Sequence, residues 1–177
     1  MHVLKVVVAT TAALALVVAV PMSAHAASGT SSATVTVTGG VLAISVPTSA
    51  GNLGSLSETV AGGTISGPLG QVQVSDARAA AAGSGWVASV IATAFTPPSG
   101  PAIPASAVSY TAGAITKVGT ATYTADDPSD LTGVAPAVTA TGITGDNSAT
   151  WNPTITVAVA GGMAAGVYAA TITHSVV

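Results

Sequence analysis

Apolar and polar residues alternate with a period of two along much of the chain after residue 33. Successive side chains of a β-strand point to opposite faces, so this alternation predicts strands. Val and Thr recur in the alternating runs, and their branched side chains pack well on a pleated surface. About nine strands are expected, at 34–38, 41–46, 71–75, 85–95, 107–110, 114–124, 137–141, 154–159 and 167–176.

Glycine, proline and Asx turn residues separate these runs, as at 39–40, 97–101 and 145–147. The alanine-rich stretch 76–82 is too short for an independent helix, and we expect a loop or a single turn there. Many short strands divided by turns are typical of an all-β fold. The sequence therefore predicts a single antiparallel β-sandwich, immunoglobulin-like in architecture, with longer loops at 49–63 and 96–104.

The first 26 residues have the three parts of a secretory signal peptide. Lys5 precedes an apolar run at 6–20, Pro21 ends that run, and 24–26 reads Ala-His-Ala, with small residues flanking a cleavage point. The run is shorter than the roughly 20 residues of a membrane-spanning helix, although an uncleaved anchor is the alternative. We expect a signal peptide at 1–26, a single exported domain at 27–177, and no membrane span after cleavage.

Composition narrows the possible functions. Only 5% of the residues are charged, the mean hydropathy is +0.70, and the chain has three Lys and Arg residues and no Cys. A nucleic-acid interface needs a basic patch, and disulfides or thiol chemistry need cysteine, so these classes are excluded. Small Ala and Val residues fill a sandwich core, while Thr supplies surface polarity. The scarcity of ionisable groups favours a binding or structural role over catalysis.

Few side chains offer acid–base chemistry. His174 lies in an alternating run near the C-terminus. It is either a catalytic or ligand-facing imidazole or a half-buried strand residue, and the second interpretation is favoured. A glycosidase needs two carboxylates across a cleft, and Asp76 and Glu58 are the candidates for such a pair, but nothing in their spacing supports this. We therefore expect no enzymatic activity.

Asp126, Asp127 and Asp130 form the densest group of charges in the chain. Carboxylate oxygens suit calcium, and Asp146 from another loop offers a further ligand. The segment lacks the spacing of an EF-hand loop, so a solvated acidic loop with Asx-turn geometry is favoured. No cofactor is expected, with calcium as the alternative.

Trp86 and Trp151 are the only tryptophans. Aromatic residues at strand ends can stack on sugars or anchor protein partners. In a chain that is 3% aromatic, a core position is favoured for both residues.

Two segments resemble the WxL-domain surface proteins of bacteria. The first comprises 69–78, which reads LGQVQVSDAR, and 85–90, which reads GWVASV; the second is 165–176, which reads AGVYAATITHSV. Ala88 stands where the first motif has Leu, and His174 stands where the second has Trp. The resemblance implies a β-rich secreted protein of the Gram-positive cell surface, associated non-covalently with the wall peptidoglycan. It marks Trp86, Tyr168 and His174 as ligand-binding residues.

Two functional hypotheses follow. The first is a secreted surface domain that associates with the cell wall. The alternative is a secreted structural or adhesin-like subunit that binds other surface proteins through an exposed sheet edge, whose backbone groups are free to pair with another chain.

Overall fold

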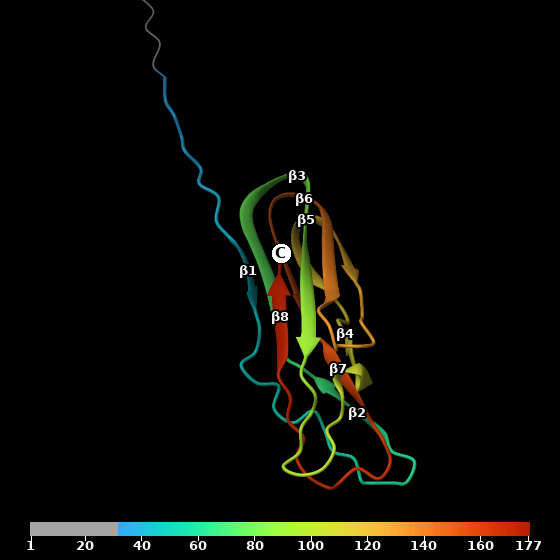
Figure 1. Ribbon diagram of the computed structural model, residues 1–177. Coiled ribbons are helices and arrows are strands. Elements are labelled where there is room, and N and C mark those ends of the chain that lie inside the picture. Colours follow the sequence, from blue (N-terminus) through green and yellow to red (C-terminus); the bar gives the residue numbers. More distant parts are fainter. Residues whose placement is uncertain (1–31) are drawn as a thin grey trace, which may run out of the picture. The chain divides into compact units, whose positions relative to one another are not determined.

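The computed structural model describes residues 32–177, and in this range the regular secondary structure is almost wholly β-strand (Figure 1). The predicted fold class, an all-β sandwich of antiparallel sheets, is confirmed. The predicted signal peptide at 1–26 lies outside the described residues. Within 32–177, no helix has the length and apolar character needed to cross a membrane. The elements are β1 (Leu42–Ser45), β2 (Gly63–Pro68), β3 (Val72–Ala92), the 3-10 helix η1 (Ala105–Ala107), β4 (Val108–Thr111), β5 (Thr116–Ala125), β6 (Ala135–Trp151), β7 (Thr154–Val159) and β8 (Ile172–Val176).

The strands form two antiparallel sheets. The larger has the order β1-β3-β6-β5, and β8 also pairs with β3. The smaller has the order β2-β7-β4. The strand β1 pairs with the first part of β3, from Gln73 to Asp76, whereas β8 pairs with its last part, from Ala88 to Ala92. One strand thus connects two separate parts of the larger sheet.

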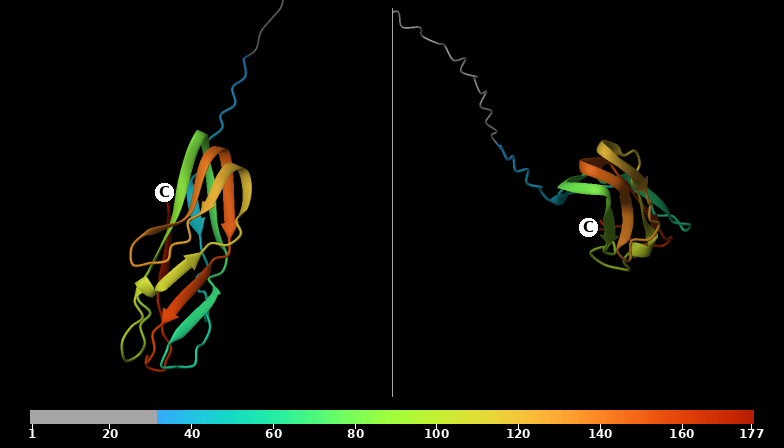
Figure 2. Two further views of the ribbon diagram at one scale, coloured as in Figure 1. Left: turned by 90° about the vertical axis from the view of Figure 1, so that its right-hand side faces the viewer. Right: turned by 90° about the horizontal axis from the view of Figure 1, so that it is seen from above.

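The long strands β3, β5 and β6 bend over together at one end of the unit formed by residues 37–177 (Figures 1 and 2). The pairing register of β3 with β6 shifts between Asp76 and Trp86, and that of β5 with β6 shifts on both sides of Thr120. Bulges of this kind bend and twist a strand. Glycines with positive φ supply the required backbone conformation in each bent strand: Gly83 in β3, Gly119 in β5, and Gly142 and Gly145 in β6. We call this bend the folded end.

The bend gives the larger sheet two halves that face each other. Trp86 in the second half of β3 donates a hydrogen bond to Asn147, which pairs with the first half of β3. Alternate residues along β3 point inward, and the buried members are Val72, Val74, Asp76, Trp86, Ala88, Val90 and Ala92. Most of these side chains are small, so the predicted core of Ala and Val residues is present.

Several local predictions are wrong. Residues 34–38 form no strand, and Val35 is 89% exposed, because backbone pairing with β3 reaches only to Gly40. The segment 76–82 lies within β3 rather than in a loop, and 145–147 lies within β6 rather than in a turn. The last strand starts at Ile172 instead of 167. An alternating pattern shows that a segment suits a strand, but the strand forms only where a neighbouring strand is available for backbone pairing.

Candidate functional site

A buried hydrogen-bond network surrounds Asn147 near the folded end. The Oδ1 atom of Asn147 accepts bonds from Trp86 Nε1 at 3.0 Å and from the hydroxyl of Tyr123 at 3.2 Å. Its Nδ2 atom donates to Asp76 Oδ2 at 3.3 Å. The rings of Trp86 and Tyr123 also pack with their centroids 5.6 Å apart. One amide therefore connects three strands and both halves of the bent sheet.

The carboxylate of Asp76 is the charged member of this network. Arg78 binds it with two side-chain bonds, from Nε at 2.8 Å and from Nη2 at 2.9 Å, and with its backbone N–H. The hydrogen bonds from Arg78 lower the pKa of Asp76 to about 2, against the opposing effect of burial. Arg78 also donates to the carbonyl of Gly85 across the bend. The carboxylate of Asp76 thus has a structural role. It is not paired with Glu58, which lines a cavity elsewhere in the fold.

A second cluster joins the two sheets at Tyr110. Trp151 Nε1 donates to the hydroxyl of Tyr110 at 2.7 Å, and Nε2 of His174 lies 3.3 Å from the same oxygen. Because the indole can only donate, the Tyr110 hydroxyl hydrogen is free to be donated to His174 Nε2. His174 is then neutral, with its hydrogen on Nδ1, an atom that is buried and has no partner among the described residues. Burial raises the pKa of Tyr110 and lowers that of His174 to about 4.

This environment makes the stability of the fold depend on the pH through His174. In the unfolded chain the imidazole has its ordinary pKa near 6.5, so between pH 6.5 and about 4 the unfolded state binds more protons than the folded state. We expect the free energy of unfolding to fall as the pH is lowered through this window, by at most about 1.4 kcal/mol per pH unit. Denaturant unfolding of the wild type and of His174→Phe at several pH values measures the effect. Equal pH dependence of both proteins would contradict it.

The two segments that resemble WxL domains lie side by side in the structure. Strand β8 pairs with the second half of β3, with Ala88 opposite Val176 and Val90 opposite His174. Trp86, 2% exposed, and the half-buried His174 point inward from these strands. The outward positions are Val87, Ser89 and Ile91 on β3 and Thr173 and Ser175 on β8. The two WxL-like segments therefore form adjacent strands. Of the three residues that the resemblance marks as ligand-binding, Trp86 and His174 face the core.

The three acidic residues predicted as calcium ligands have separate partners. Asp126 accepts a bond from the Thr139 hydroxyl, Asp127 from the backbone N–H of Ala112, and Asp130 from that of Thr132. The bonds from Thr132 also lower the pKa of Asp130. Asp146 instead accepts from the N–H of Ala79 at the folded end. In the part of the chain that the structure describes, no three acidic, His or Cys side chains are arranged to hold a metal ion.

Tyr168, the third residue marked by the resemblance, lines a cavity at the opposite end of the unit from the fold of the long strands. Loops 46–62, 93–104 and 160–171 gather there, and we call this the loop end. The cavity has a volume of about 840 Å³. The Tyr168 hydroxyl donates to the carbonyl of Ala164, which fixes the ring against the loop.

Sequence reasoning missed the residues on which both networks depend. Asn147 sits in a Gly-Asp-Asn triplet that is typical of a turn, and Tyr110 is one residue of a short strand. Nothing in their local sequence indicates a hydrogen-bond hub, because their partners are up to 71 residues away. The cavity was also missed, since its walls come from loops far apart in the chain.

Comparisons of the chain with protein-family models, with curated proteins and with solved structures found no match.

Proposed function

We propose that this protein is a secreted, non-catalytic domain of the bacterial cell surface that associates non-covalently with the cell wall. The observation that carries the proposal is the pairing of the two WxL-like segments. Residues 88–92 and 172–176 are about 80 positions apart in the sequence, yet they form one antiparallel ladder. Because the two motifs pair with each other, we take them as support for a common origin with the WxL domains. Wall association is the function that this resemblance implies.

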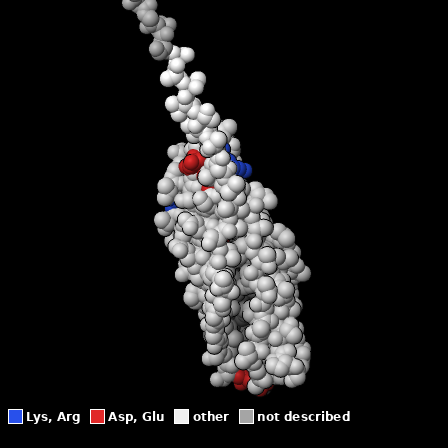
Figure 3. Space-filling view, turned by 90° about the vertical axis from the view of Figure 1, so that its left-hand side faces the viewer, with Lys and Arg blue, Asp and Glu red and all other residues white. Residues whose placement is uncertain are grey.

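The outward face of this ladder is the surface that we assign to the wall. Trp86 is enclosed in the core, so stacking of its ring on a sugar would require opening of the fold. Ser89 and Ser175, which lie opposite each other, instead present hydroxyl groups on the outer face. Hydroxyl groups donate and accept hydrogen bonds, as sugar and peptide groups of peptidoglycan require. On the face shown in Figure 3, charged side chains lie near the folded end and the loop end and are scarce between them.

Sedimentation with purified peptidoglycan sacculi tests this function. We expect the wild-type protein to be retained on the sacculi and Ser175→Glu to bind about tenfold more weakly, a loss of about 1.4 kcal/mol. Thr122→Glu is the matched control, because it adds the same charge to an exposed strand position on β5. Absence of wild-type retention would overturn wall association, and equal loss in both variants would overturn the assigned face.

The alternative role, binding of other surface proteins through a sheet edge, would use β5. This strand is one edge of the larger sheet, and it is exposed at most positions. Two features disfavour pairing along it: the register shifts around Gly119, and Lys117, which lies over the ring of Tyr123 at 6.0 Å. Bulges and charged edge side chains, especially lysine, are among the devices by which natural edge strands avoid association. Wall association is therefore the better supported function.

A further inference from the structure

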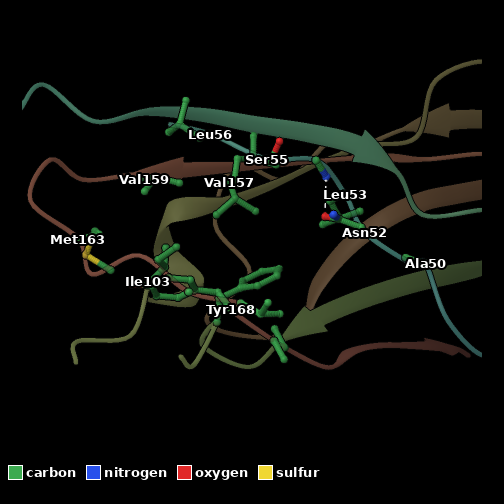
Figure 4. A pocket seen from close by; sticks show the side chains of 18 of the residues that line it. Ala50, Asn52, Leu53, Ser55, Leu56, Ile103, Val157, Val159, Met163 and Tyr168 are labelled. Atoms are coloured by element: carbon green, nitrogen blue, oxygen red, sulfur yellow. Dashed lines mark hydrogen bonds between the residues drawn. The ribbon is translucent and has the colours of Figure 1, made fainter. Parts of the chain in front are cut away.

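The cavity at the loop end has the size and walls of a ligand site. Its volume of about 840 Å³ lies within the range of small-molecule pockets, roughly 300–1,000 Å³. The side chains in Figure 4 converge on it from three loops and from the smaller sheet. Its apolar walls include Leu53, Leu56, Ile65, Val157, Val159 and Met163.

The loop 46–62 beside the cavity packs closely on strand β2. A Cβ atom on Gly67 would overlap the carbonyl oxygen of Leu53, and one on Gly63 would lie 2.9 Å from the Leu56 side chain. Glycine at both positions of β2 therefore lets the loop pack directly on the strand. Within the loop, Asn52 Oδ1 accepts a bond from the N–H of Gly54 and holds a local turn. The cavity wall is thus built by specific contacts.

The chemistry of the lining restricts the ligand. No Lys, Arg or His lines the cavity, and Glu58 is its one charged residue among those the structure describes. Two of its polar side chains, Asn52 and Tyr168, already make internal hydrogen bonds. The other polar side chains of the lining are the hydroxyl groups of Thr48, Ser49, Ser55, Thr59 and Thr171. The larger part of the wall is apolar, and an aliphatic chain would replace water against it. A carboxylate head group would meet the like charge of Glu58, while an amine would meet an opposite charge.

We propose that this cavity binds an aliphatic chain whose head group is uncharged or carries an amine, with the head group near Glu58. The inference goes beyond wall association and uses a different part of the molecule.

Alkyl compounds of one chain length test the proposal by their head groups. Calorimetric titration with dodecanol below its solubility limit, and with dodecylamine and dodecanoate below their micellar concentrations, should give binding of the alcohol and the amine. We expect dodecanoate to bind at least about tenfold more weakly than dodecylamine. Glu58→Gln should remove most of the difference between dodecylamine and dodecanoate. No binding of dodecanol, or equal binding of dodecanoate, would overturn the proposal.

Two substitutions in the cavity wall test whether the ligand binds there. Met163→Trp adds volume on a loop, and Leu56→Gln makes the wall polar, so both should weaken dodecanol binding about tenfold or more. Val118→Trp is the control, because Val118 is 66% exposed on β5. Thermal unfolding identifies any variant that fails to fold. Unchanged binding in both folded variants would overturn the site.

Wall association can fail independently of this proposal. Ser175→Glu should bind dodecanol as the wild type does. If sacculi retain the wild type but dodecanol does not bind, the cavity proposal falls alone. If dodecanol binds and sacculi do not retain the protein, the cavity proposal is supported and wall association falls.

Discussion

Replacing Trp86 with alanine is expected to lower the free energy of unfolding by about 4 kcal/mol, the cost typical of removing a large aromatic ring from a core. The indole is 2% exposed, packs against Tyr123, and donates its Nε1 hydrogen to Asn147. Its loss leaves a cavity between the two halves of the bent sheet and removes one of the two donors to the Asn147 oxygen. Urea unfolding of the wild type and the variant measures the change.

A conservative variant separates the two contributions of Trp86. Trp86→Phe retains an aromatic ring but cannot donate to Asn147, so we expect a smaller loss of about 1–2 kcal/mol. Wall retention measured on the same folded proteins tests the role of the residue. If Trp86→Ala unfolded at the wild-type urea concentration and yet lost retention on sacculi, the residue would act as a ligand contact instead of a core support.

The second large effect is expected at Asp76. Asp76→Ala should lower the free energy of unfolding by about 3 kcal/mol, because it removes the acceptor of an ion pair and leaves a buried donor of Asn147 unpaired. The Arg78 side chain is 38% exposed, so water can solvate its charge after the change, which limits the loss. Asp130→Ala is a suitable control, since that exposed carboxylate accepts from Thr132 alone. Chemical denaturation at pH 7 distinguishes the two variants, and equal effects would contradict the role of Asp76.

The low pKa of Asp76 also predicts that the free energy of unfolding falls in acid. Its pKa is about 2 in the folded protein and near 3.8 in the unfolded chain. The stabilisation from Asp76 is therefore complete above pH 4 and is lost as the pH falls through 3.8 towards 2. Asp76→Asn should lack this loss, and unfolding measured at pH 4, 3 and 2 would show the wild type and the variant converging in stability.

Much of the fold could be predicted because alternation is a local property. The runs at 71–75, 107–110 and 154–159 lie in strands β3, β4 and β7 to within a residue or two, and the small Ala and Val residues fill the core. The strand predicted at 34–38 is absent because it has no pairing partner in the described part of the chain. Its Val and Thr residues suit a strand, but no described strand pairs with them.

The sites depended on distant pairing and could not be predicted in the same way. Trp86 and Asp76 are visible in the sequence, but Asn147, which connects them, is distinguishable from a turn residue only after β3 and β6 pair and bend. The cavity likewise needs loops at 47–59 and 160–172 to meet.

An all-β sandwich with small core residues and little charge can be predicted from the sequence, because strand periodicity and composition are local properties. The inward orientation of Trp86 and His174 and the separate partners of the acidic residues at 126–130 follow from the three-dimensional structure alone. So does the apolar cavity at the loop end, in which Glu58 is the one charged group among the described residues. The direction in which a side chain points is set by the bend of the long strands and by their pairing across the sheets. Those interactions join residues that are far apart in the chain.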